Sequence, residues 1–135
     1  MTKLGSAIIA RLQDRPGFWT PLDGRVDWTV SLPETPYPRA VLTVVTADRP
    51  DTFEGPDLRF TRVQLDVYSD KSAEEASSIA EEAIEALQPE ATVGGVRFCR
   101  APEVEGPTDS GDQLDTLYAY RARTDFALLH ADEGV

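Results

Sequence analysis

Residues 59–76, RFTRVQLDVYSDKSAEEA, pass from a strand pattern to a helix pattern within a few positions. Apolar residues occupy every second position from 63 to 67, and this period of two is typical of a strand buried on one face. Ser72 is a favourable N-cap, and Glu75 follows three residues later, as in a capping box. The stretch therefore predicts a half-buried strand followed directly by a helix.

The same two periodicities recur along the rest of the chain. Apolar residues at helical spacing predict helices over residues 3–14 and 73–88. Four strand patterns cover residues 40–47, 62–68, a segment that begins at 96, and 118–128. Clean alternation favours an antiparallel sheet with one covered face, and the helices can supply the cover. The predicted fold is therefore α+β, a mainly antiparallel four-stranded sheet with two helices on one face, in the order α-β-β-α-β-β.

Length and charge restrict what the chain can be. Its 135 residues are typical of one domain, and we expect that domain over residues 1–129 and a flexible tail over residues 130–135. The 24 acidic and 13 basic residues give a net charge of −11, which argues against gripping nucleic-acid phosphates or an anionic membrane surface. No apolar run is long enough to span a membrane, and the first residues do not resemble a signal peptide. The single cysteine, Cys99, excludes an internal disulfide and fits synthesis in the cytoplasm.

The sequence contains no pattern typical of a catalytic or metal site. His130, the only histidine, lies near the C-terminus, and we interpret it as a solvated tail residue. Cys99 has no CxxC partner and is interpreted as a structural thiol. Asp109, Asp112 and Asp115 recur every third residue, whereas an EF-hand needs ligands at alternate positions. We interpret them as solvated acids, with a weak surface cation site as the alternative, and expect no enzyme activity, metal site or cofactor.

Opposite charges alternate on the polar face of the predicted strands. Because side chains two residues apart share a face, five polar residues are expected together, and the face they form is either solvated or an interface. Basic residues interleaved with acidic ones favour ion pairs, across strands or between subunits, over contact with nucleic acid. These residues are Arg62, Gln64, Asp66, Arg121 and Arg123.

Several short motifs follow one another in an order that resembles a known family. Gly-Arg-Val at residues 24–26 precedes an aromatic residue, LPETPYP at residues 32–38 leads into a strand, and Asp-Val-Tyr-Ser at residues 66–69 ends the next strand before a helix. In this succession the chain resembles, over about residues 4 to 128, the tail terminator (tail completion) proteins of long-tailed phages and gene transfer agents. The long acidic segment at 105–115 and the short first helix depart from the family pattern.

The resemblance implies a structural subunit of the virion, made in the host cytoplasm, that forms a ring, hexameric in the family. Such a ring caps the head-proximal end of the tail tube, stops tube polymerisation and joins the tail to the head connector or neck protein. DNA would pass through the lumen without specific binding, and no membrane would be involved. The polar sheet face would lie between neighbouring subunits.

Two long polar loops, over residues 48–57 and 105–115, would then reach the tail tube protein or the connector. The loop residues expected at these contacts are Asp48, Arg49, Asp51, Phe53, Glu54, Asp57, Asp109, Asp112 and Asp115.

Two alternatives stay open. Another head–tail junction subunit, such as a head completion or connector protein, shares the small size and the ring formation, and binding to the portal would distinguish it. A stand-alone α+β module that binds a small molecule would instead be a monomer or dimer with a real pocket.

Overall fold

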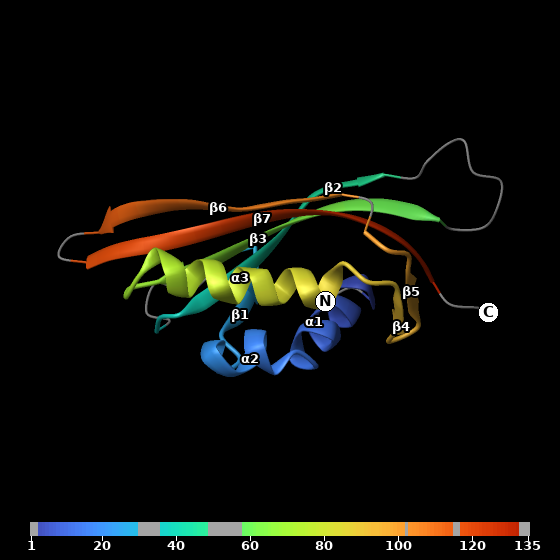
Figure 1. Ribbon diagram of the computed structural model, residues 1–135. Helices are drawn as coiled ribbons and strands as arrows, with labels where there is room; N and C mark the ends of the chain where they lie inside the picture. Colours follow the sequence, from blue (N-terminus) through green and yellow to red (C-terminus); the bar gives the residue numbers. More distant parts are fainter. Residues whose placement is uncertain (1–2, 30–35, 49–57, 102, 115–116, 133–135) are drawn as a thin grey trace.

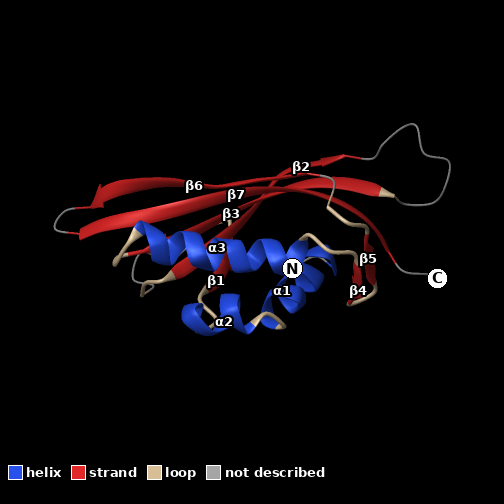
Figure 2. Ribbon diagram, viewed as in Figure 1, coloured by secondary structure: helices blue, strands red, loops and turns tan. Residues whose placement is uncertain are grey.

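The computed structural model describes residues 3–29, 36–48, 58–101, 103–114 and 117–132. In this part of the chain, three helices lie on one face of a curled sheet of seven strands (Figure 1). Figure 2 shows the helices gathered on one side of the sheet and the strands curving over them. The elements in chain order are α1 (Lys3–Gln13), α2 (Pro16–Leu22), β1 (Val26–Trp28), β2 (Arg39–Asp48), β3 (Arg59–Ser69), α3 (Ala73–Leu87), β4 (Ala91–Val93), β5 (Val96–Phe98), β6 (Glu103–Leu114) and β7 (Leu117–Asp132).

The sheet is built around the long antiparallel pair of β3 and β7. Its strand order is β1-β2-β3-β7-β5-β4, and β6 pairs with β7 as well. β6 and β5 pair with successive parts of β7, since β6 opposes residues 117–127 and β5 opposes residues 130–132. β1 pairs with β2 in parallel, whereas all other described pairs are antiparallel. The sheet is therefore mixed.

The predicted four-stranded antiparallel sheet with two helices is wrong, because the structure has seven strands and three helices. The stretch after the first helix was expected to be loop, but it forms α2, with a proline at its start, and the short strand β1. The Gly94–Gly95 turn joins two short strands, β4 and β5, where one strand was expected. The acidic stretch at 105–115 was expected to be a loop, but residues 103–114 form β6.

The strand-to-helix stretch at residues 59–76 has the structure that its pattern predicts. Val63, Leu65 and Val67 of β3 are fully buried against the helices, and α3 begins immediately after Ser72. The alanines Ala76, Ala80 and Ala83 of α3 are also fully buried. Small side chains at these positions let α3 approach the sheet closely, so the core forms between α3 and the inner faces of β3 and β7.

The start of α3 is held by a variant of the predicted capping box. The Ser72 side chain accepts a hydrogen bond from the backbone N–H of Glu75, at 3.1 Å, as predicted. The Glu75 carboxylate does not return to Ser72; it accepts a hydrogen bond from the buried hydroxyl of Ser69, at 2.7 Å. Ser69 Oγ in turn accepts from the backbone N–H of Lys71, at 3.0 Å. The last residue of β3 therefore fixes the angle at which α3 leaves the sheet.

The C-terminal strand extends further than the sequence pattern indicates. His130 lies inside β7 and is only 4% exposed, so its interpretation as a solvated tail residue is wrong. Its ring nitrogen Nε2 lies 2.8 Å from the hydroxyl oxygen of Thr61 on β3, which is also buried. β7 continues to Asp132, and residues 133–135 lie outside the described residues. In the described residues, no helix is long and apolar enough to cross a bilayer.

Candidate functional site

The five polar residues predicted to share a sheet face lie on the side of the sheet away from the helices. We call this side the open face, because no described element covers it (Figure 1). Asp66 lies opposite Arg123 in the β3–β7 register, Tyr68 lies opposite Arg121, and Gln64 lies opposite Asp125. Residues directly opposite in an antiparallel pair point to the same side. The structure thus brings Arg62, Gln64, Asp66, Arg121 and Arg123 together.

Asp66 is the centre of this group. Its side chain is only 7% exposed although it points away from the helices. One carboxylate oxygen accepts a hydrogen bond from Nε of Arg123 at 2.9 Å and lies 4.0 Å from Nε of Arg121. The other oxygen accepts from the amide of Gln64 at 3.1 Å. Two guanidinium groups therefore share one buried carboxylate, and the hydrogen bond to Asp66 raises the pKa of Arg123.

A second group on the open face is acidic and extends onto β6. Glu105 lies opposite Asp125, and Glu103 lies two residues before it on the same strand. A hydrogen bond with Glu103 and the charge of Glu103 raise the pKa of Glu105, and the charge of Asp125 adds to the shift. Two described cations lie beside this group: Arg62, whose Nη2 lies 3.7 Å from Glu103, and Arg123, whose pKa is raised in part by the charge of Asp125. Negative charges are therefore crowded at this end of the open face.

The first residues of β2 lie at the other end of the open face. Arg39 lies opposite Tyr68, which places it in the same cross-strand row as Arg121. Its guanidinium lies over the ring of Tyr37, at 4.5 Å, and over the ring of Tyr68, at 5.7 Å. Its Nη2 also donates to the Tyr37 hydroxyl, at 3.2 Å. Two aromatic rings therefore hold this arginine in place.

The family-like motifs meet at this same corner of the fold. Arg25 donates from Nε to the carbonyl oxygen of Pro38, at 2.9 Å, and its own carbonyl accepts from the N–H of Ala40, at 2.9 Å. The Gly-Arg-Val motif and the Pro-Tyr-Pro motif are thereby joined side by side. The Asp-Val-Tyr-Ser motif contributes Asp66, and Leu32 and Pro33 lie outside the described residues. The motif residues in the described part thus hold one end of the open face.

The sequence did not predict every member of the open face. Arg39, Glu103, Glu105 and Asp125 lie on it but were not named as site residues. Asp125 alternates with Arg121 and Arg123, so its position could be read from the pattern. Glu103 and Glu105 are also two residues apart. This spacing places them on one face only if the segment is a strand, and the sequence did not predict a strand there.

The predicted contact loops are placed only in part. Asp48 is the last residue of β2, and Arg49, Asp51, Phe53, Glu54 and Asp57 lie outside the described residues. Asp109 and Asp112 belong to β6 rather than to a loop, and Asp115 lies outside the described residues. Asp109 is exposed and opposes Ala122, so it lies on the other side of the sheet from Asp66.

The two lateral edges of the sheet differ in character. Beyond Leu42, where the pairing with β1 ends, β2 exposes Val44 and Val45, which are 47% and 54% exposed. The β6 edge carries acidic residues, Pro107 and a register shift between Glu105 and Thr108. Proline, charge and bulges are features that protect a strand edge from pairing with another chain. The β2 edge has less of this protection.

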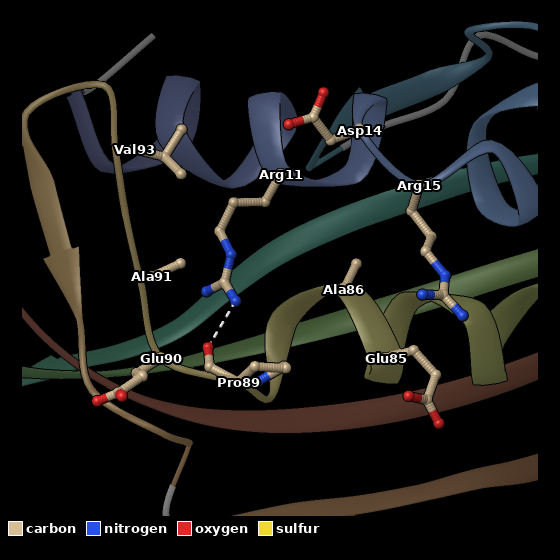
Figure 3. A pocket seen from close by; sticks show the side chains of 9 residues that line it. All are labelled: Arg11, Asp14, Arg15, Glu85, Ala86, Pro89, Glu90, Ala91 and Val93. Atoms are coloured by element: carbon tan, nitrogen blue, oxygen red, sulfur yellow. Dashed lines mark hydrogen bonds between the residues drawn. The ribbon is translucent and has the colours of Figure 1, made fainter.

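A shallow pocket on the helix side contains no arrangement of side chains suited to catalysis. Its volume is about 280 Å³, and Figure 3 shows the residues that line it, from α1, the end of α3 and β4. Arg11, its buried cation, donates to the carbonyl oxygen of Pro89 at 2.7 Å and stacks over Phe98 at 4.8 Å, while burial lowers its pKa. Arg15 is paired with Glu82 at 2.6 Å. Both arginines therefore join helices to their neighbours.

Neither of the other candidate groups forms a site. Cys99 is half-buried, and its backbone N–H donates to Leu129, at 2.9 Å. Across the described segments, no group of three or more histidine, cysteine, aspartate or glutamate side chains is placed to hold a metal ion. The open face is therefore the surface on which a function can be argued.

Comparisons with known proteins give a fold but no family. No family model matches the chain, and no curated protein matches it. One solved structure, a chain of the virion of a native gene transfer agent particle, is similar with a TM-score of 0.58 and 15% identity, covering 97% of this chain and 95% of that one. A second solved structure, of a protein without a stated function, is similar with a TM-score of 0.56 and 18% identity over 93% of each chain. At these identities the similarity shows a shared fold.

Proposed function

We propose that this chain is a non-enzymatic structural subunit of a phage or gene transfer agent virion. The observation that carries the proposal is the fold shared with the virion chain over almost the full length of both proteins. Structural similarity over almost the full length of both chains favours a subunit of the same kind over a common motif inside a different protein. The open face supports it, because paired charges on a sheet suit contact with another protein.

Within the virion, the role we propose is that of a tail terminator. The motif succession of this family supports it, and in the structure the described motif residues gather at one corner of the fold rather than scattering over it. The chain would form a ring, of six subunits as in the family, at the head-proximal end of the tail. The ring would cap the tube and join it to the head connector. A net charge of −11 favours passage of DNA through the lumen without specific contacts.

The polar residues of the open face would lie at the contact between neighbouring subunits. The segment after β2 and the β6–β7 hairpin would reach the tail tube protein or the connector. The hairpin suits such a contact because it is long and extends past the start of α3 (Figure 1). The residues proposed for the subunit contact are Arg62, Gln64, Asp66, Arg121 and Arg123.

A tube-capping experiment tests the terminator role. Tail tube protein from the same particle is polymerised with and without the purified chain, and the products are imaged by negative-stain electron microscopy. We expect shorter tubes that carry a ring at one end. A control is the Lys3→Glu/Lys71→Glu variant, whose changes fall on exposed residues outside the open face and should leave capping intact.

The outcome also separates the alternatives. Binding to portal rings with no effect on the tubes would favour a connector or head completion subunit. If neither tubes nor portal bind the chain, the proposal of a junction role is wrong.

A further inference from the structure

Two tyrosines lie on the helix side of β7, near the turn of the β6–β7 hairpin, which extends past the start of α3 (Figure 1). Tyr118 and Tyr120 point to that side because they alternate with Ala122, which is buried opposite Val67. Their ring centroids are 4.7 Å apart in an edge-to-face arrangement. Tyr118 is 43% exposed, and Tyr120 is half-buried. The pair therefore presents an ordered and accessible aromatic surface.

The neighbouring part of β6 leaves room for the Tyr118 ring and places a carboxylate beside it. Gly111 lies opposite Tyr120, and a Cβ at Gly111 would overlap the hydroxyl and the ring of Tyr118. Asp109 lies two residues earlier on the same side of β6, at a spacing of about 7 Å. Asp109 is exposed and has no ion pair with another described residue. An unpaired carboxylate therefore lies next to the point that the Tyr118 ring covers.

The other two tyrosines of the chain indicate what such a pair can bind. Tyr37 and Tyr68 lie beside each other across the guanidinium of Arg39, at 4.5 and 5.7 Å from it. Tyr118 and Tyr120 have no arginine over their rings within the described segments. A planar guanidinium stacks well on aromatic faces and also pairs with carboxylates. The second tyrosine pair, with its carboxylate, therefore has the composition of an arginine site but lacks the arginine.

We call Tyr118, Tyr120 and Asp109 the tyrosine platform, and we propose that it binds an arginine side chain of a partner protein. The guanidinium lies over the Tyr118 ring, as Arg39 lies over Tyr37, and donates to the Asp109 carboxylate. It makes both contacts at once, because its N–H groups point outward in its plane while its face rests on the ring.

A basic protein partner also fits the charge of the whole chain. The net charge of −11 attracts a basic surface and repels nucleic-acid phosphates. A tyrosine alone would accept any apolar group, but the exposed carboxylate beside it favours a cation. The platform lies near the turn of the hairpin that the proposed function brings to the tail tube protein. It rests on that function for the identity of the partner, but not for the chemistry of the site.

Titration with a hexa-arginine peptide tests the platform without any other virion protein. NMR spectra of the isotope-labelled chain report the affinity at the backbone amides of residues 109–111 and 118–120. We expect Tyr118→Ala to weaken binding there by about 2- to 5-fold, the size of a cation–π contact at an exposed ring. Tyr118→Phe keeps the aromatic face and should bind like the unmodified chain. Asp109→Asn should weaken binding by a similar factor.

Controls separate the platform from general charge attraction and from folding. Tyr118→Ala leaves the net charge unchanged, and Glu90→Gln removes the same charge as Asp109→Asn from an exposed position next to β4. Glu90→Gln should therefore leave the affinity at the platform unchanged. A hexa-lysine peptide carries the same charge without a planar face and should bind less tightly. If Tyr118→Ala does not fold, judged by circular dichroism, Tyr118→Leu takes its place.

The peptide experiment can overturn the platform in two ways. Tyr118→Ala and Asp109→Asn may not bind hexa-arginine as tightly as the unmodified chain does, and hexa-lysine may not bind as tightly as hexa-arginine. Either result would mean that the chain attracts basic peptides by its net charge alone.

Tube capping by Tyr118→Ala tests the identity of the partner. We expect this variant to cap tail tubes less well than the unmodified chain. Equal capping would overturn the tube protein as the partner and leave the terminator role standing. Weaker self-association of Tyr118→Ala, measured by analytical ultracentrifugation, would overturn it too, because a second copy would then supply the arginine. An unmodified chain that binds the peptide at the platform but caps no tubes would contradict the terminator role and support the platform.

Discussion

Asp66 shows at the scale of a single residue how a polar sheet face can be ordered. A carboxylate that is 7% exposed is stable only if its oxygens are paired, and both oxygens of Asp66 accept hydrogen bonds from neighbouring side chains. Val41, buried and opposite Asp66 on β2, excludes water from one side. The positions of Arg121 and Arg123 thus depend on one acidic side chain.

Replacement of Asp66 tests this dependence. Asp66→Asn should destabilise the protein by about 1–3 kcal/mol, because two arginines lose the charge that they share. Asp125→Asn is the matched control on the same face, and it should change stability little, because the charge of Asp125 repels Glu105 and attracts Arg123. Urea denaturation of the three proteins measures the difference. Equal stability of Asp66→Asn and the unmodified chain would contradict the central role of Asp66.

Glu105 gives a pH-dependent prediction. Its pKa in the folded protein is raised by Glu103 and Asp125 and partly lowered by Arg62, so the fold binds this proton more tightly than the unfolded chain does. The ionised side chain therefore opposes folding at neutral pH, and stability increases as the pH falls through the raised pKa. Glu105→Gln should raise the melting temperature at neutral pH. The gain should disappear at about pH 3, below the ordinary pKa of glutamate.

Thermal unfolding of the unmodified chain and of Glu105→Gln at several pH values checks the direction of this change in stability. A Glu105→Gln variant that is less stable at neutral pH would show that this carboxylate contributes a favourable interaction, and that the acidic end is not crowded.

At the scale of the element, β6 depends on its bulge. The register with β7 shifts between Glu105 and Thr108, and Gly106 within the shift has a φ of +111°. A Cβ at Gly106 would lie 2.5 Å from the carbonyl oxygen of Arg123. Only glycine fits this position, because backbone strain and close approach act together.

Gly106→Ala should therefore loosen the β6–β7 hairpin. We expect a loss of about 1–3 kcal/mol from the backbone conformation, plus displacement of β6 near Arg123. Thr108→Ala, two residues away and exposed, is the control and should change stability little. Hydrogen exchange should show faster exchange in β6 for the glycine variant only. Unchanged exchange there would mean that the bulge tolerates a side chain.

The elements also show how much of the fold the sequence determined. Val63, Leu65 and Val67 alternate with polar residues and Ser72 begins α3, so local pattern alone gave β3, α3 and five members of the open face. β6 was missed because aspartate, serine and glycine disfavour strands locally. Its strand conformation comes from pairing with the sixteen-residue β7, a long-range contact that no local pattern reveals. Glu103 and Glu105, which β6 contributes to the open face, were missed with it.

At the scale of the whole molecule, two electrostatic effects oppose each other during assembly. Each chain carries a net charge of −11, so copies repel one another at long range. Ion pairs that the open face would form with a neighbouring subunit attract at short range. Salt screens the first effect strongly, because the Debye length falls from about 30 Å at 0.01 M to about 10 Å at 0.1 M. Pairs that are partly buried in a contact are screened less.

Self-association should therefore pass through a maximum as the salt concentration rises. We expect weak association at about 0.01 M NaCl, the strongest near about 0.1–0.3 M, and a decline towards about 1 M, where the Debye length is about 3 Å. Light scattering at fixed protein concentration measures the curve. The Arg121→Glu/Arg123→Glu variant, which reverses two charges of the proposed subunit contact, should lack the maximum. Association that only grows with salt would instead point to an apolar contact, for which the exposed Val44 and Val45 on the β2 edge are the candidates.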